Sequence, residues 1–267
     1  MFTNVLVGVD GRATGRDAIA LARELVDPDG TLTLAHVRGR ESAVEDENSR
    51  KLLEREQRET GVEAGIVSVL SASPGRGLHE QAEKEGADLL AVGSCRRGAL
   101  GRAVLGDDTR AALNGASSTV AIAPSGYATH HPPLTTVGVG FDGSPESMAA
   151  LAMARELAAT STATIHALDV VSLPTIVYGG YVGPSYQEAI EVPLERARQR
   201  LSELPDVTGR AVPGLAGEEL AAFGDEVDIL VIGSRGYGPV QRLVLGSTSN
   251  YLARHARCPL LVLPRSA

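Results

Sequence analysis

Three glycines and two hydroxyl side chains near the end of the chain are spaced as in an anion-binding site. Gly233, Gly236 and Gly246 follow the pattern Gly-x2-Gly-x9-Gly, and Ser247 and Thr248 come directly after it. Glycine lets the backbone approach a ligand closely and adopts positive φ without steric cost. The start of a helix has unpaired N–H groups and the positive end of the helix dipole, which together favour phosphate. The stretch is therefore a candidate phosphate site.

The same residue types also serve structure alone. Glycine is common at strand ends, and Ser247 could simply cap a helix. The stretch lacks the Gly-Lys-Ser/Thr of a Walker A loop, and it does not directly follow the first strand as a Rossmann Gly-x-Gly-x-x-Gly does. Taken alone, the spacing leaves both interpretations open.

A strand and a helix are expected on either side of these glycines. The apolar run Asp228–Ile232 leads directly into Gly233 and predicts a buried strand, and residues 247–256 predict a helix. A phosphate held here would lie between the end of a strand and the start of a helix.

Two further strands end in residues that could contact the same ligand. Val-rich runs predict strands that end at Asp142 and at Val170. Apolar strands that alternate with helices are typical of a doubly wound parallel sheet covered on both faces. Ligands bind such sheets beyond the carboxyl ends of the strands, where the strand order reverses. We therefore expect Asp142 and Gly233 to face one cleft, although Asp142 could also cap a turn with Gly143.

The chain contains this unit twice. Thr3–Leu25 aligns with Thr135–Leu157, and Asp88–Thr109 aligns with Asp228–Ser249. A repeat of this length is the size of a domain and too long for a solenoid. We therefore predict an α/β protein of two tandem domains.

The two predicted domains comprise residues 1–126 and 134–267. Each is expected to be a doubly wound, Rossmann-like domain with a five-stranded parallel sheet. The polar, Pro-containing stretch Pro124–Pro133 would join them as a linker.

The glycine spacing, the aspartate at the end of the first strand (Asp142) and the duplicated α/β unit together resemble the universal stress protein family in its tandem two-domain form. The resemblance covers nearly the whole chain, and the motif Gly-x2-Gly-x9-Gly-Ser is complete only in the second copy. It implies a fold of the adenine nucleotide alpha hydrolase-like type. It also implies ATP as the ligand, with or without Mg²⁺. It further implies that the last strands of the two copies, Thr119–Pro124 and Pro259–Pro264, pair with each other and make the chain a pseudo-dimer.

The resemblance places each expected contact at a numbered residue. The glycines and Ser247 would hold the ribose and the phosphates, Asp142 would lie beside the nucleoside, and Val170 would touch the adenine. Arg235 could add positive charge near the phosphates. The whole expected site consists of Asp142, Val170, Gly233, Arg235, Gly236, Gly246, Ser247 and Thr248.

The first copy carries an altered version of the motif. Gly93 and Gly106 remain, but Arg96 stands where the second copy has Gly236, and Asp107 stands where it has Ser247. A carboxylate there would repel phosphate, by about 4 kcal/mol per charge pair at 4 Å in an effective dielectric of about 20. We therefore expect ATP mainly in the second domain. A phosphate clamp of a different kind, made by Arg96 and Arg97, is the alternative.

A tyrosine-containing stretch, residues 170–189, occurs in the second copy only. It contains Tyr178, Tyr181 and Tyr186 and follows the strand that ends at Val170. The stretch could be a lid over the nucleotide, a docking surface for a protein partner or a surface loop without either function.

Composition limits the classes of function. The formal net charge of −8 argues against non-specific nucleic-acid binding, which requires a basic surface. No apolar run approaches the roughly 18 residues of a membrane-spanning helix. Two cysteines, Cys95 and Cys258, form no disulfide framework and fit a reducing cytoplasm.

The sequence favours a nucleotide-binding regulatory protein over an enzyme. Hydrolysis of ATP requires a positioned base or water-orienting group, and apart from Asp142 no carboxylate is tied to the cleft by a motif. We therefore expect no catalytic residue and no resident metal ligand. The expected partners are an adenine nucleotide, an unidentified protein and a second copy of the chain in a homodimer. A slow ATPase, or an enzyme that phosphorylates its own Ser247 or Thr248, is the alternative.

Overall fold

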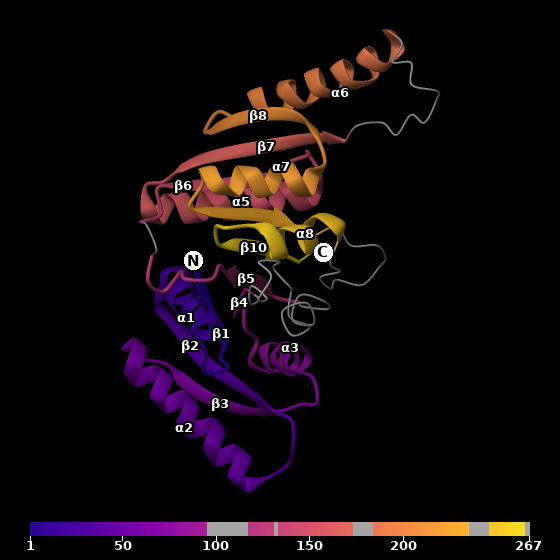
Figure 1. Cartoon of the computed structure of the whole chain (residues 1–267). Coiled ribbons are helices and arrows are strands. Elements are labelled where there is room, and N and C mark those ends of the chain that lie inside the picture. The colour runs from indigo at the N-terminus through magenta and orange to yellow at the C-terminus, as the bar shows by residue number, and fades with distance from the viewer. Residues whose placement is uncertain (95–116, 131–132, 173–183, 235–245, 265–267) are drawn as a thin grey trace.

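Residues 1–94, 117–130, 133–172, 184–234 and 246–264 are described by the computed structural model (Figure 1). Their strands are β1 (Phe2–Gly8), β2 (Val26–Arg38), β3 (Gly65–Leu70), β4 (Leu89–Gly93), β5 (Thr119–Ala123), β6 (Thr136–Gly140), β7 (Thr164–Ser172), β8 (Val207–Gly214), β9 (Ile229–Gly233) and β10 (Leu260–Leu263). Their helices are α1 (Ala13–Leu25), α2 (Ala43–Thr60), α3 (Pro74–Glu85), α5 (Pro145–Ser161), α6 (Pro184–Ser202), α7 (Ala216–Phe223) and α8 (Ser247–His255), with a 3₁₀ turn at Gly224–Glu226.

All these strands belong to one sheet. Their order is β3-β2-β1-β4-β5-β10-β9-β6-β7-β8. Within the first half (β1 to β5) and within the second half (β6 to β10) every pairing is parallel. The first strand of each half lies beside the fourth, with Val5 opposite Leu89 and Val137 opposite Ile229. The predicted α/β fold with two doubly wound, five-stranded parallel units is confirmed.

The two halves meet through their last strands. β5 and β10 are antiparallel, and Leu261 lies opposite Ala121 at the centre of the pairing. The expected pairing of the two copies is therefore confirmed, and it makes one continuous sheet across the chain (Figure 1). It also covers two strand edges that would otherwise be open to other chains.

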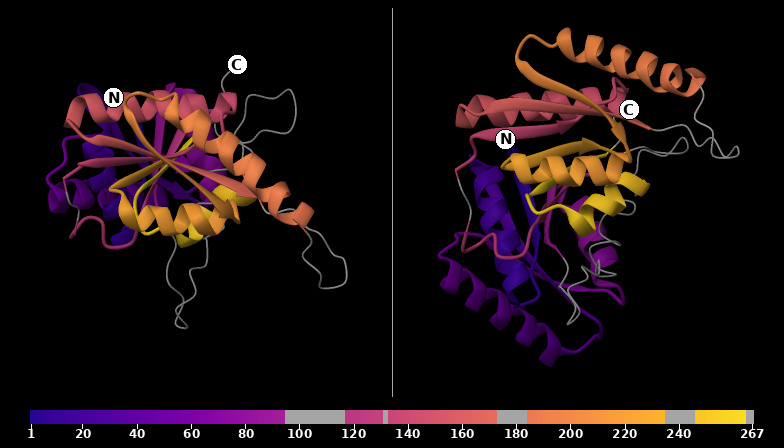
Figure 2. Two further views of the ribbon diagram at one scale, coloured as in Figure 1. Left: turned by 90° about the horizontal axis from the view of Figure 1, so that it is seen from above. Right: turned by 45° about the horizontal axis from the view of Figure 1, so that its top comes forward.

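Helices cover both faces of the sheet (Figure 2, left). Because successive side chains of a strand point to opposite faces, Val5 and Val7 contribute to one apolar core and Leu6 to the other. The first core includes buried residues of α1, α2, α5 and α6, and the second includes buried residues of α3, α7 and α8. Both cores extend across the two halves of the sheet.

The segment between the halves is fastened to α1. The carboxylate of Asp17, which is buried, accepts hydrogen bonds of 2.9 Å from the backbone N–H groups of Gly126 and Ala128. Between them, the hydroxyl of Tyr127 donates to Glu24 at 2.6 Å. Burial and the neighbouring Glu24 raise the pKa of Tyr127. The stretch that the sequence marks as a polar linker is therefore anchored at three consecutive residues.

The pairing of β5 with β10 should contribute strongly to stability. Leu261 is fully buried at its centre, so Leu261→Ala should lower the free energy of unfolding by about 2–5 kcal/mol through lost burial and a residual cavity. Urea denaturation followed by circular dichroism measures the change. Val44→Ala, at a side chain that is 69% exposed, is the control and should stay within about 0.5 kcal/mol of the original chain.

Candidate functional site

A pocket lies at the carboxyl ends of β6, β7 and β9, beside the start of α8. Its volume is about 150 Å³. Six of the residues expected at the site line it: Asp142, Val170, Gly233, Gly246, Ser247 and Thr248. The other two, Arg235 and Gly236, lie outside the described residues. The structure thus brings together every expected residue that it describes.

The first turn of α8 forms one wall of this pocket. Gly246 is the N-cap residue, with extended backbone angles (φ −66°, ψ 164°), and Ser247 is the first residue of the helix. The interpretation of Ser247 as the helix cap is therefore wrong by one position. Gly246 and the three following hydroxyl residues all line the pocket. The N-terminal N–H groups of a helix and the positive end of its dipole favour an anion at this wall.

Gly246 and Gly233 are glycines for different reasons. A Cβ built on Gly246 would meet no atom of the described residues within 4 Å, so none of them requires a glycine at this position by close packing. A Cβ built on Gly233 would lie 2.6 Å from the carbonyl carbon of Glu146, closer than real Cβ atoms approach. Gly233 is therefore required for packing of β9 against the first turn of α5, whether or not a ligand binds.

The first half contains the same close packing. A Cβ built on Gly93 would lie 2.7 Å from the carbonyl carbon of Thr14, at the start of α1. This explains why the first copy retains Gly93 although its motif is otherwise altered. The expected consequences of Arg96, Arg97, Gly106 and Asp107 fall outside the described residues.

Asp142 organises the turn between β6 and α5. Its Oδ1 accepts hydrogen bonds from the backbone N–H of Ser144, at 3.0 Å, and from the Ser144 hydroxyl. Ser144 in turn caps α5 by accepting from the N–H of Ser147 at 3.2 Å. Gly143 between them has φ +79°, which favours glycine. The turn-capping interpretation of Asp142 is confirmed, and the same residue also lines the pocket.

An ion pair that the sequence analysis did not find lies next to Val170. The carboxylate of Asp169 is 2.7 Å from the guanidinium Nη2 of Arg200 on α6, and the side chain of Asp169 is only 3% exposed. Burial raises the pKa of Asp169 and the nearby charge of Asp142 raises it further, whereas Arg200 lowers it. The pair is separated by 31 residues in sequence, and no local pattern predicts it.

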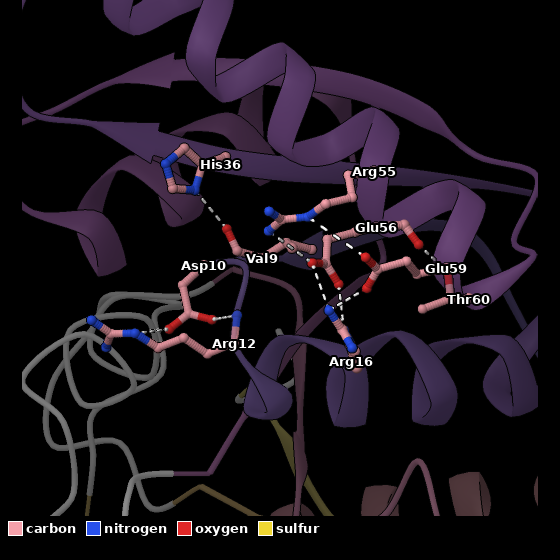
Figure 3. A network of polar contacts seen from close by, with 9 residues as sticks. All are labelled: Val9, Asp10, Arg12, Arg16, His36, Arg55, Glu56, Glu59 and Thr60. Carbon is pink, nitrogen blue, oxygen red and sulfur yellow. Dashed lines mark hydrogen bonds and ion pairs between the residues drawn. The ribbon is translucent and has the colours of Figure 1, made fainter.

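The first half uses its charged side chains differently at the corresponding place (Figure 3). His36 precedes Val37 as Asp169 precedes Val170, and its Nδ1 lies 2.8 Å from the carbonyl oxygen of Val9. The buried carboxylate nearby is Glu56 of α2, which Arg16 of α1 contacts at 2.8 Å and Arg55 at 3.3 Å. The pair of Arg16 with Glu56 joins α1 to α2, whereas Arg55 and Glu56 belong to the same helix. The end of β2 carries His36 where β7 has the acidic Asp169.

A larger hollow of about 870 Å³ lies elsewhere, between the two halves. Its charged walls already serve the fold: Arg23 donates to the carbonyl of Thr60 at 3.2 Å, and Glu24 accepts from Tyr127. None of the residues expected at the site line it. Size alone therefore does not identify the functional site in this molecule.

The described residues include neither a cluster of metal ligands nor a membrane-spanning helix. No group of three or more His, Cys, Asp or Glu side chains in that part of the chain could hold a metal ion. No helix among the same residues is both long enough and apolar enough to cross a membrane. Cys258 is a buried free thiol there, and burial raises its pKa to about 12.

Comparison with known proteins is consistent with this architecture. The sequence profile of the universal stress protein family matches residues 1–124 and again residues 133–264. The chain belongs to the universal stress protein family. The two matches correspond to the two halves of the sheet.

Full-length relatives support the tandem arrangement. A universal stress protein of Mycolicibacterium smegmatis is 28% identical over 97% of this chain and 96% of its own length. One from Mycobacterium tuberculosis is 31% identical over 67% of this chain and 63% of its own length. The crystal structure of a universal stress protein from Archaeoglobus fulgidus matches 98% of both chains, with a TM-score of 0.69 and 19% identity. That similarity shows a common fold.

Substitution of Gly233 and of Gly246 should affect the free energy of unfolding to different extents, because only Gly233 is in close contact with another part of the described chain. Gly233→Ala should lower the free energy of unfolding by at least about 1–3 kcal/mol, because its Cβ overlaps the backbone of Glu146. Gly246→Ala should change it by at most about 1 kcal/mol, because only the N-cap preference is altered. Thermal and urea denaturation of both variants test this difference. Equal destabilisation by the two substitutions would contradict it.

Proposed function

We propose that this universal stress protein is an ATP-binding regulatory module of the stress response, and that its second domain holds the nucleotide. The observation that carries the proposal is the open position at Gly246. No described residue lies within 4 Å of a Cβ built on Gly246, and a phosphate could occupy this space and bind the N–H groups of the helix start.

The lining residues suggest how ATP would lie. The phosphates would meet the first turn of α8 with Ser247 and Thr248, and the adenine would lie against Val170 with the nucleoside near Asp142. The described pocket is smaller than the roughly 300–1,000 Å³ of ordinary ligand sites. Arg235 and Gly236 would complete the phosphate end of the site.

Carboxylates at the pocket favour a cation beside the phosphates. Asp142 and Glu146 both line it, and their charges would repel a triphosphate. Mg²⁺ bound to the phosphates would offset this repulsion, because Mg²⁺ is ordinarily held by substrate phosphates with one or two carboxylates. We therefore propose ATP with Mg²⁺ as the ligand of the second domain.

A regulatory role fits this site better than catalysis. Asp142 is engaged in the turn through Ser144, and hydrolysis requires a group that orients water. The hydroxyls of Ser247 and Thr248 at the phosphate end favour one alternative, slow transfer of a phosphoryl group to the protein itself. Mass spectrometry of the chain after prolonged incubation with ATP distinguishes this alternative from binding alone.

We also propose a division of labour between domain 1–126 and domain 134–267. Arg96 and Asp107 in the first domain would weaken or abolish ATP binding there. The first domain would then serve assembly through the paired strands β5 and β10. A homodimer, an unidentified protein partner and a location in the reducing cytoplasm complete the proposal.

The stoichiometry and position of ATP binding test the proposed function. Isothermal titration should give one ATP per chain. Gly246→Val should weaken binding at least tenfold, because loss of even one hydrogen bond to a charged group costs about 1.5–3 kcal/mol. Its thermal stability should remain close to that of the original chain.

Gly106→Val provides the matched control, because Gly106 is the corresponding glycine of the first copy. This variant should bind ATP as the original chain does. Two nucleotides per chain would contradict the proposed division between the domains. Unchanged affinity in the Gly246→Val variant would contradict the proposed position of the phosphates.

A further inference from the structure

An ion pair lies just behind the two strand ends that carry Asp142 and Val170. Asp169 is the residue before Val170 on β7, and Arg200 reaches it from α6 at 2.7 Å. The same arginine lies over the turn that follows β6, since a Cβ built on Gly143 would be 2.9 Å from its Cδ. Gly143 directly follows Asp142. Arg200 therefore contacts Asp169 and the turn at Gly143. Each of these residues is next in sequence to a residue that lines the pocket, Val170 or Asp142.

Burial of the acid distinguishes this pair from the surface ion pairs of the second half. The side chain of Asp169 is 3% exposed, whereas that of Arg200 is 41% exposed. Arg155 and Asp206 are also bonded, at 2.6 and 2.7 Å, but their side chains are 41% and 45% exposed. Exposed pairs are screened by solvent and contribute little. A buried carboxylate that loses its partner remains as an uncompensated charge, which is strongly unfavourable.

The charge of Asp169 affects the pocket. Asp142 is close enough to raise the pKa of Asp169, although burial is the larger cause. The two carboxylates therefore repel each other at the edge where the nucleotide would lie. Arg200 compensates the charge of Asp169, and it comes from α6, none of whose described side chains lines the pocket.

We propose that Arg200 is a positioning residue of the nucleotide site, which couples α6 to ATP binding by compensating the buried charge of Asp169 and holding the turn at Gly143. The inference rests on the proposed function of the second domain. Displacement of α6 by a protein partner would remove Arg200 from Asp169 and lower the affinity for ATP. By reciprocity, bound ATP would favour the docked position of α6.

The two halves differ in this respect. In the first half, Arg55 lies over Gly11 as Arg200 lies over Gly143, but it pairs with Glu56 of its own helix. His36 replaces the acidic residue at the end of the strand. Among the described residues, α6 of the second half pairs with a buried carboxylate at the end of its neighbouring strand, and the corresponding helix of the first half, α2, does not.

A cycle of variants tests the role of charge. Arg200→Ala should weaken ATP binding about tenfold, which is within the usual range of coupling between sites. Asp169→Asn combined with Arg200→Ala removes both charges and should recover most of this loss. Removing the second charge would also relieve a fold destabilised by an unpaired buried carboxylate. Thermal denaturation of the same chains therefore measures the change in stability separately, and the loss of affinity in Arg200→Ala should persist at a temperature at which that variant is fully folded. Arg155→Ala, which breaks the exposed pair, is the matched control and should leave the affinity unchanged.

Isothermal titration with ATP and Mg²⁺ measures the affinity of the three variants and of the original chain in one series. Arg200→Lys keeps the cation and replaces Arg200→Ala should the latter not fold; its affinity should be intermediate. Unchanged affinity in Arg200→Ala, or no recovery in the double variant, would overturn the inference while the original chain still binds ATP. An original chain that binds no nucleotide would overturn the proposed function, and the inference with it.

Discussion

The close contact between Gly233 and the backbone of Glu146 is the constraint on which the candidate site depends. It brings the end of β9 against the first turn of α5, so that no side chain fits between them. Asp142 and Ser144 then fix the turn that leads from β6 into the same helix. The pocket forms where these elements meet the start of α8.

Duplication preserved this packing and changed the chemistry around it. Gly93 repeats the close contact in the first half, where it meets Thr14. The buried acid described in the second half, Asp169, belongs to a strand end, whereas the buried acids described in the first half, Asp17 and Glu56, belong to helices. A common scaffold thus carries two different distributions of buried charge, and a difference in ligand binding between the halves would follow from it.

The sequence predicted the fold and six of the residues that line the described pocket, because both depend on short local patterns. Apolar runs located the strands, and the glycine spacing located the wall formed by α8. The pairing of Asp169 with Arg200 could not be predicted, because Arg200 is one of several arginines on α6 and the partner lies on another element. The start of β2 at Val26 could not be predicted either, because proline and glycine are unfavourable inside a strand. The strand continues through Pro28 and Gly30, where the register with β1 shifts and a missing donor is tolerated.

The anchoring of residues 126–128 to α1 limits the kind of motion by which the chain could transmit a signal. In many two-domain proteins the domains close around a ligand by rotating about a flexible hinge. Here Asp17 and Glu24 hold the connecting segment, and the sheet continues without interruption from one half to the other. A hinge motion at this boundary would have to break both these anchoring contacts and the sheet. Any change caused by a ligand should therefore be local, such as a shift of a single helix against a sheet that does not move.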